Sequence, residues 1–240
     1  MKLKHILNCT RRTYFEVDGS DYVYCGTGTA FLCRYRNRDY AVVASHSIRG
    51  ISPDTLRICF SNAGREFLPI QYMLVPEAPN KDDDEWLDWR VLRLNKDQYD
   101  GRTFGDGPPY DLSDGEVWRP SDTGGTFIAR GYQTGLAIGT SFIDYDTKQL
   151  HEQAVIVEAS YVRATDRKLV HEIRFPDLSH CQTLDGVSGA GLFWVDDRKR
   201  PMPHKLAGIL HRATLSSCAG YFIEGTLLLD VLRRDLAQHP

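Results

Sequence analysis

Short apolar runs separated by polar turns follow one another along most of this chain. The runs are rich in β-branched and aromatic residues, and they are too short for ordinary helices. Their spacing is typical of an all-β protein built from barrels. We therefore predict strands over Tyr22–Tyr24, Tyr40–Val43, Leu56–Phe60, Trp89–Leu94, Thr126–Tyr132, Ala154–Ser160, Gly191–Val195 and Lys205–Leu210.

Two stretches depart from this pattern. Gly101–Pro120 contains Gly-Asp-Gly-Pro-Pro and Ser-Asp-Gly, which makes it the best candidate for an interdomain linker. Thr226–Leu236 carries apolar residues near helical spacing, with Arg233 and Arg234 facing outward, and predicts an amphipathic helix on the second half of the chain. The apolar positions of this helix are Leu227, Leu228, Val231, Leu232 and Leu236.

Composition excludes several classes of protein. The chain has 240 residues, of which 42% are hydrophobic and 25% are charged, as in an ordinary soluble globular protein. The net charge of −3 gives no general attraction to nucleic acid or to a membrane surface. No apolar run is long enough to span a bilayer. The segment Met1–Cys9 lacks the apolar core of a signal peptide, so we expect a cytoplasmic protein.

The cysteines give little support for a metal site. No two of them are spaced as Cys-x-x-Cys, so we expect neither zinc nor another metal. An even number permits disulfides, but a cytoplasmic location favours free thiols, and a bridge between Cys181 and Cys218 stays open. The six cysteines are Cys9, Cys25, Cys33, Cys59, Cys181 and Cys218.

A serine flanked by glycines is the first candidate for chemistry. The segment Gly186-Val187-Ser188-Gly189-Ala190-Gly191 precedes the apolar run that ends at Val195. Glycines on both sides of a serine let the backbone turn sharply and let amide groups point at one spot in front of the hydroxyl. A nucleophilic serine needs this arrangement, because an oxyanion forms when its oxygen attacks a carbonyl. A serine close to glycines is also common in ordinary turns.

Two upstream segments place a histidine and an aspartate at the ends of strands. His46 follows the apolar run Tyr40–Ala44, and Asp88 opens the run that begins at Trp89. A half-buried carboxylate needs a strong hydrogen-bond donor, which an imidazole N–H can supply. Taken singly, each residue is equally well explained as the polar end of a strand. The order histidine, aspartate, serine is that of chymotrypsin and differs from the orders of subtilisin and the α/β-hydrolases.

Together these segments resemble the trypsin-like serine protease superfamily, and are most similar in style to bacterial Deg/HtrA-type catalytic domains. Three further segments extend the resemblance over nearly the whole chain. Gly26–Leu32 resembles the glycine-rich first strand, Ile128–Tyr132 the opening strand of the second barrel, and Ala207–Leu210 the strand along the substrate pocket.

The resemblance implies a fold and a domain organisation. It implies an all-β protein of two antiparallel six-stranded β-barrels, chymotrypsin-like, followed by a C-terminal α-helix. Residues 12–105 would form the barrel with the histidine and the aspartate, and residues 106–120 the interdomain linker. Residues 121–240 would form the barrel with the serine, together with the helix.

The resemblance also implies the activity of a serine endopeptidase acting on a polypeptide substrate. Ser188 would be the nucleophile, His46 the general base and Asp88 the group that orients His46. The backbone amides of Gly186 and Ser188 would form the oxyanion hole. No metal or organic cofactor is required.

The sequence departs from the family at Val187, where trypsin-like zymogens carry an aspartate that pairs with a new N-terminus. By position, the resemblance implies a substrate pocket formed by Gln182, Thr183, His211, Arg212, Ala213 and Gly220. Such a pocket lacks the carboxylate that selects lysine and arginine, and it could accept a polar or acidic side chain. Alternatively, His211 and Arg212 point into the barrel or into solvent.

Two other functions are compatible with the same residues. One is a binding module that keeps the protease fold without catalysis. The other is a protease that becomes active only when a regulatory protein partner orders its loops. A dedicated protein target in the cytoplasm is expected in preference to bulk digestion, because an unregulated broad protease would harm its own cell.

Overall fold

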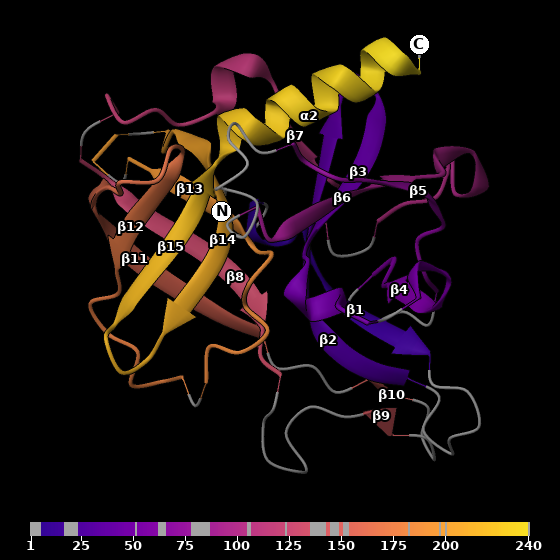
Figure 1. The fold of residues 1–240 in the computed structure, drawn as a ribbon, viewed down its shortest axis with the longest axis horizontal. Helices are drawn as coiled ribbons and strands as arrows, with labels where there is room; N and C mark the ends of the chain where they lie inside the picture. The colour runs from indigo at the N-terminus through magenta and orange to yellow at the C-terminus, as the bar shows by residue number, and fades with distance from the viewer. Residues whose placement is uncertain are drawn as a thin grey trace.

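Two β units and one long helix make up the computed structural model of this protein (Figure 1). The structure describes residues 6–16, 24–50, 52–61, 66–77, 87–104, 107–122, 124–134, 143–144, 149–150, 154–181, 183–196, 198–199 and 201–239. Within these ranges no helix has the length and apolar character that crossing a membrane requires.

The first unit is an open antiparallel sheet of order β4-β1-β2-β3-β6-β5. Its hairpin between β2 and β3 turns at Arg36 and Asn37, whose φ angles of 46° and 66° match the twist of the flanking strands. A short strand, β7, pairs with β2 in parallel. The strands are β1 (Thr10–Glu16), β2 (Tyr24–Tyr35), β3 (Arg38–Ala44), β4 (Leu56–Ile58), β5 (Ile70–Leu74), β6 (Trp89–Leu94) and β7 (Tyr110–Asp111).

The second unit is a closed barrel of order β11-β12-β15-β14-β13-β8, so its strands have no free edge. Its strands are β8 (Thr126–Tyr132), β11 (Ala154–Ala164), β12 (Val170–Arg174), β13 (Gly191–Val195), β14 (His204–Thr214) and β15 (Ala219–Glu224). A separate two-stranded sheet consists of β9 (Ile143–Asp144) and β10 (Gln149–Leu150). Single turns of 3₁₀ helix are η1 (His46–Ile48), η2 (Pro53–Thr55), η4 (Lys96–Gln98) and η5 (Asp114–Glu116).

The helix α2 (Gly225–Gln238) follows the last barrel strand and lies across the top of both units (Figure 1). Its apolar face is buried, as the sequence predicts, except that Leu236 is only half-buried. The sequence assigned this helix to the second barrel alone. The structure shows that it also reaches the first sheet, where Asp235 accepts hydrogen bonds from Tyr40 and Tyr72.

The two units share one apolar core, to which the sheet, the barrel and α2 all contribute buried side chains. At its centre the ring of Phe31 on β2 packs edge-on against Phe193 on β13, with ring centroids 5.8 Å apart. Burial of large side chains from both units resists their separation, because each aromatic ring removes a large apolar area from water. The halves of the chain are therefore held in a defined relative position.

The predicted strands from Tyr40–Val43 onward are confirmed, and those over Trp89–Leu94, Thr126–Tyr132 and Gly191–Val195 have the bounds found in the structure. Of the predicted strand Tyr22–Tyr24, Tyr22 and Val23 lie outside the described residues, and Tyr24 is the first residue of β2. One closed six-stranded barrel is present, but the described part of the first unit does not close into a second one. The domain boundaries stay a prediction.

The first sheet stays open because β4 and β5 separate at a proline. The hairpin that joins them pairs at its closed end, where the amide of Leu68 donates to the carbonyl of Ile58 at 2.8 Å. The next residue, Pro69, already turns its backbone to the other side, where its carbonyl accepts from the amide of Asn95 at 2.8 Å, and the pairing with β4 stops there. Beyond Pro69, β5 pairs with β6 and leaves a gap beside β4.

Candidate active site

Neighbouring strands bring His46 and Asp88 together. β3 and β6 are antiparallel, and Ala44 lies opposite Trp89 at the end of their ladder. The pairing of β3 and β6 ends at this point, and the amide of Ser45 donates to the carbonyl of Asp88 at 2.9 Å. The register of two strands therefore places a histidine and an aspartate side by side, although they are far apart in the sequence.

The two side chains are hydrogen-bonded. Nδ1 of His46 donates to Oδ2 of Asp88, which fixes the tautomer and leaves Nε2 as the basic ring nitrogen. The side chain of Asp88 is 11% exposed and that of His46 is 42% exposed, so the pair has a buried end and an open end. Burial alone raises the pKa of Asp88, but the hydrogen bond and charge of His46 outweigh it and lower the net pKa.

A second histidine lies behind this pair. His211 on β14 is buried and close enough to Asp88 for its protonated form to lower the pKa of that carboxylate. Burial, and next the neighbouring charge of Arg212, lower the pKa of His211 itself to about 4. The imidazole of His211 is therefore neutral at neutral pH.

The loop of Ser188 turns through two glycines in the left-handed region. Gly186 has φ of 85° and Gly189 has φ of 92°. A Cβ on Gly189 would come within 2.5 Å of the carbonyl oxygen of Thr29 and 3.0 Å of the amide of Ala44. Glycine is thus required both by the backbone angle and by the close approach of the loop to the strands that lead to His46.

A buried threonine joins this loop to both units. The hydroxyl of Thr29 on β2 accepts from the amide of Tyr132 on β8 at 2.9 Å and donates to the carbonyl of Gly186 at 2.6 Å. On the other side of the loop, Val187 is fully buried, and a Cβ on Gly131 would touch it. The loop is therefore held by packing and hydrogen bonds, and no ion pair lies beneath it in the part of the chain that the structure describes.

Gly186 and Ser188 present unengaged backbone donors. Among the hydrogen bonds of the described residues, neither amide donates to a protein acceptor. The Ser188 hydroxyl likewise forms no hydrogen bond within the described part of the chain, and it is half-buried. Two free amides beside a serine can bind an oxygen that becomes negatively charged.

One cleft of about 720 Å³ is lined by all three predicted catalytic residues. His46, Asp88, Ser188 and Gly186 all line it, as do Arg212 and Ala213 of the predicted pocket. The remaining lining residues were not among the predicted site residues: Thr27, Ser47, Arg49, Thr134, Leu184, Asp185 and Thr214.

The other residues of the predicted substrate pocket lie elsewhere. The carbonyl of Thr183 accepts from the side chain of Gln133, and Gly220 lies in the barrel wall against Phe175. Neither residue, nor the buried His211, lines the cleft, and Gln182 is outside the described residues. Cys181 and Cys218 carry free thiols.

The sequence around Thr29 did not indicate that this residue joins the two units, because its two hydrogen-bond partners lie far along the chain. Arg49 could have been found, since it follows His46 within one turn of η1. The arrangement as a whole contains a hydroxyl, an imidazole held by a mostly buried carboxylate, and two free amides in one cleft. These are the groups that nucleophilic acyl transfer requires.

Two solved structures match almost the entire chain. One is the crystal structure of Rv3671c from M. tuberculosis, a serine-to-alanine mutant in its inactive form. It is 14% identical, covers 98% of this chain and 90% of that chain, and has a TM-score of 0.49. The other is the Rv3671c protease in its inactive form, 14% identical, with 95% and 89% coverage and a TM-score of 0.49. No protein-family model and no curated protein matches this chain.

Proposed function

We propose that this protein is a serine endopeptidase of chymotrypsin-like fold that cleaves a polypeptide substrate. One observation carries the proposal: the hydrogen-bonded pair of His46 and Asp88 lines the same cleft as Ser188 and Gly186. The two β units both contribute these groups, and Thr29 joins one unit to the other at this point.

The proposed reaction has two steps. Ser188 Oγ attacks the carbonyl carbon of a peptide bond while Nε2 of His46 takes the hydroxyl proton. The tetrahedral intermediate collapses, the C–N bond breaks, and His46 gives the proton to the leaving amine. Water then attacks the acyl-enzyme in the same way and releases the acid. Asp88 holds the imidazole in the correct tautomer and stabilises it when it carries a charge.

The amides of Gly186 and Ser188 serve as the proposed oxyanion hole. They are fixed in advance, because the amide of Thr134 holds the carbonyl of Asp185 at 2.8 Å and the amide of Ala190 holds the carbonyl of Val187 at 3.2 Å, and these carbonyls share peptide planes with the two amides. Donors that need no reorganisation stabilise the developing charge most effectively, and loss of one costs about 10²- to 10³-fold in rate.

The test is labelling with a fluorophosphonate probe, followed by mass spectrometry of the modified peptide. We expect the wild-type chain to carry the probe on Ser188, and Ser188→Ala and His46→Ala to remain unlabelled. Hydrolysis of an ester or peptide should fall by about 10⁴- to 10⁶-fold in both variants. Ser216→Ala is the matched control, because Ser216 is an exposed serine in the turn after β14 and should have no effect.

Other outcomes of this experiment select the other two functions. A wild-type chain that is never labelled, with or without added protein partners, supports a binding module and contradicts the proposal. Labelling that requires a partner supports a protease with regulated assembly of the cleft. Near wild-type turnover in Ser188→Ala would show that the nucleophile is a different residue.

A further inference from the structure

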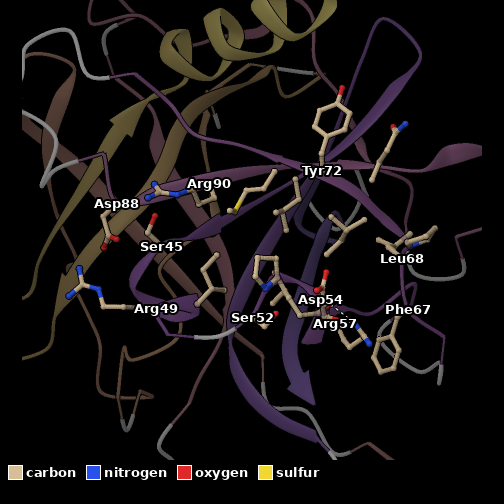
Figure 2. Close-up of a pocket in the computed structure, with 18 of the residues that line it drawn as sticks. Ser45, Arg49, Ser52, Asp54, Arg57, Phe67, Leu68, Tyr72, Asp88 and Arg90 are labelled. Carbon is tan, nitrogen blue, oxygen red and sulfur yellow. Dashed lines mark hydrogen bonds between the residues drawn. The ribbon is translucent and has the colours of Figure 1, made fainter. Parts of the chain in front are cut away.

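A second hollow lies in the first unit, with Asp88 at one end of its lining (Figure 2). Its volume is about 700 Å³, and it exists because β4 and β5 separate after Pro69 and expose the inner face of the open sheet. We call it the β4–β5 groove. Its apolar surface comes from Ile48, Leu56, Leu68, Ile70, Leu87 and Leu92.

The β4–β5 groove adjoins the cleft of Ser188. Arg49 and Asp88 line both hollows, so they stand where one meets the other. An extended polypeptide whose scissile bond lies at Ser188 can therefore continue past Arg49 into the groove. At about 3.3 Å per residue, only a few residues of substrate are needed to reach it.

Three arginines line the β4–β5 groove, and their charges are not equally balanced. Arg57 forms a two-pronged ion pair with Glu16, at 2.9 Å and 2.7 Å. Arg90 donates to the backbone carbonyls of Trp89 and Leu87, at 2.8 Å and 3.5 Å. Among the described residues, no carboxylate lies within ion-pair distance of Arg90 or Arg49.

The two arginines that have no carboxylate partner among the described residues, Arg49 and Arg90, lie at the same end of the groove. Figure 2 shows Arg49 and Arg90 beside Asp88, whereas Asp54 lies next to Arg57 at some distance from them. The carboxylate of Asp88 is already engaged by His46. A guanidinium that lacks a carboxylate at the mouth of an apolar groove favours an incoming anion, which it can bind through two parallel hydrogen bonds.

The free edge of β5 adds a second element of recognition. Within the described residues β5 pairs only with β6, so its other edge has unpaired backbone groups. Met73 on this strand and Val75 just beyond it are 37% and 58% exposed, which is unusual for large apolar side chains at a sheet edge. Extended peptides bind such edges by adding a strand.

We propose that the β4–β5 groove is an extended subsite for the polypeptide substrate, which binds an apolar segment carrying one glutamate or aspartate at Arg49 and Arg90. This inference rests on the proposed function, because it assigns the groove to the same substrate that Ser188 cleaves. The acidic side chain lies at a distance from the scissile bond, and the groove therefore selects substrates without taking part in the chemistry.

The test compares pairs of peptides that differ only in Glu or Gln at one position. The position is scanned over about eight residues on each side of the scissile bond, which covers the reach of an extended chain across the groove. We expect kcat/KM to favour glutamate by about tenfold at one point of the scan, mainly through KM. The double variant Arg49→Gln with Arg90→Gln should reduce this ratio to about one. Lys168→Gln removes an exposed charge in the β11–β12 turn and should keep the wild-type ratio.

The outcomes separate the groove from the proposed catalysis. Hydrolysis without any preference for glutamate overturns the inference and leaves the proposed function intact. An equal loss in the double variant for both peptides and for a small ester means that the arginines act on Asp88, which also overturns the inference.

A binding measurement removes the dependence on turnover. Fluorescence anisotropy with Ser188→Ala reports whether the labelled glutamate peptide binds more tightly than its glutamine partner, and whether the double arginine substitution abolishes the difference. If the wild-type chain neither reacts with the fluorophosphonate probe nor hydrolyses a peptide, the proposed function fails. The assignment of the β4–β5 groove to a cleaved substrate then fails with it. A glutamate preference in anisotropy would then still establish the acidic-peptide site, and equal binding would eliminate it.

Discussion

Replacement of Asp235 by asparagine is expected to loosen the attachment of α2 to the first unit. The side chain is completely buried, and its carboxylate accepts from the hydroxyls of Tyr40 at 2.7 Å and Tyr72 at 2.8 Å. Guanidinium nitrogens of Arg38 and Arg93 lie 3.8 Å from the same carboxylate. Asparagine has nearly the same shape but removes the charge and one of the two acceptor oxygens.

The magnitude follows from these contacts. A hydrogen bond to a charged group contributes about 1.5 to 3 kcal/mol, and the amide oxygen can replace one of the two. The two guanidinium groups, 18% and 15% exposed, lose their common counter-ion at the same time. We therefore expect the free energy of unfolding to fall by about 3 kcal/mol. In a chain of 240 residues this corresponds to a decrease in Tm of about 6 to 12 °C.

Thermal melting and urea titration at neutral pH measure this effect. The matched control is Asp230→Asn on the same helix, whose ion pair with Arg233 is exposed and should contribute less than about 0.5 kcal/mol. A second variant, Tyr72→Phe, removes one donor and should cost about 1 kcal/mol. If Asp235→Asn and Asp230→Asn melt at the same temperature, the carboxylate does not hold the units together, and the reasoning is wrong.

Three further predictions concern the active site. Thr29→Val removes the hydroxyl between Tyr132 and Gly186 and should lower kcat for ester hydrolysis by about tenfold or more, whereas Thr29→Ser should restore it; full activity in the valine variant would contradict this role. Gly186→Ala would place a Cβ within 2.6 Å of the carbonyl of Tyr132, at φ of 85°, and should reduce the rate of probe labelling by about 10²-fold or more; an unchanged rate would show that the loop tolerates it. Burial lowers the pKa of His211 to about 4, so as the pH falls the unfolded chain takes up a proton there before the folded chain does. The free energy of unfolding, measured in urea, should therefore be constant above a pH of about 6.5 and fall toward pH 4 by up to about 3 kcal/mol. The same pH dependence in His211→Leu would refute the assignment.

Strands whose apolar residues form a clear run or alternation could be predicted from the sequence, and β1, which buries two arginines, could not. β6, β8 and β13 were found because their apolar residues form uninterrupted or alternating runs. β1 was missed because its sequence contains Arg11 and Arg12, which would ordinarily be exposed. Arg11 is completely buried and donates to the backbone carbonyls of Gly107 and Phe60, at 2.7 Å and 3.3 Å. No local sequence pattern indicates hydrogen-bond partners that lie so far along the chain.

The catalytic candidates were easier to predict than the surface around them. His46, Asp88 and Ser188 each follow or open a recognisable apolar run, and strand register then brings the first two together. The predicted substrate pocket was assigned by position in the family pattern, and three of its residues lie on β14, where a bulge between Leu210 and Arg212 shifts the alternation of side chains. The bulge leaves no mark in the sequence. The β4–β5 groove was also beyond prediction, because it depends on where two strands separate.

The hydrogen bonds that join the two units have a consequence for the order of folding. Thr29 and Gly186 are 157 residues apart in the sequence, and Tyr40 and Asp235 are 195 residues apart. Contacts between such distant segments form slowly, because the entropy of closing long loops is lost before the contacts stabilise the chain. Each unit can thus acquire its strands before the cleft between them exists. The pair of His46 and Asp88 meets Ser188 only once these long-range contacts have formed, and the proposed proteolysis would begin at the last stage of folding.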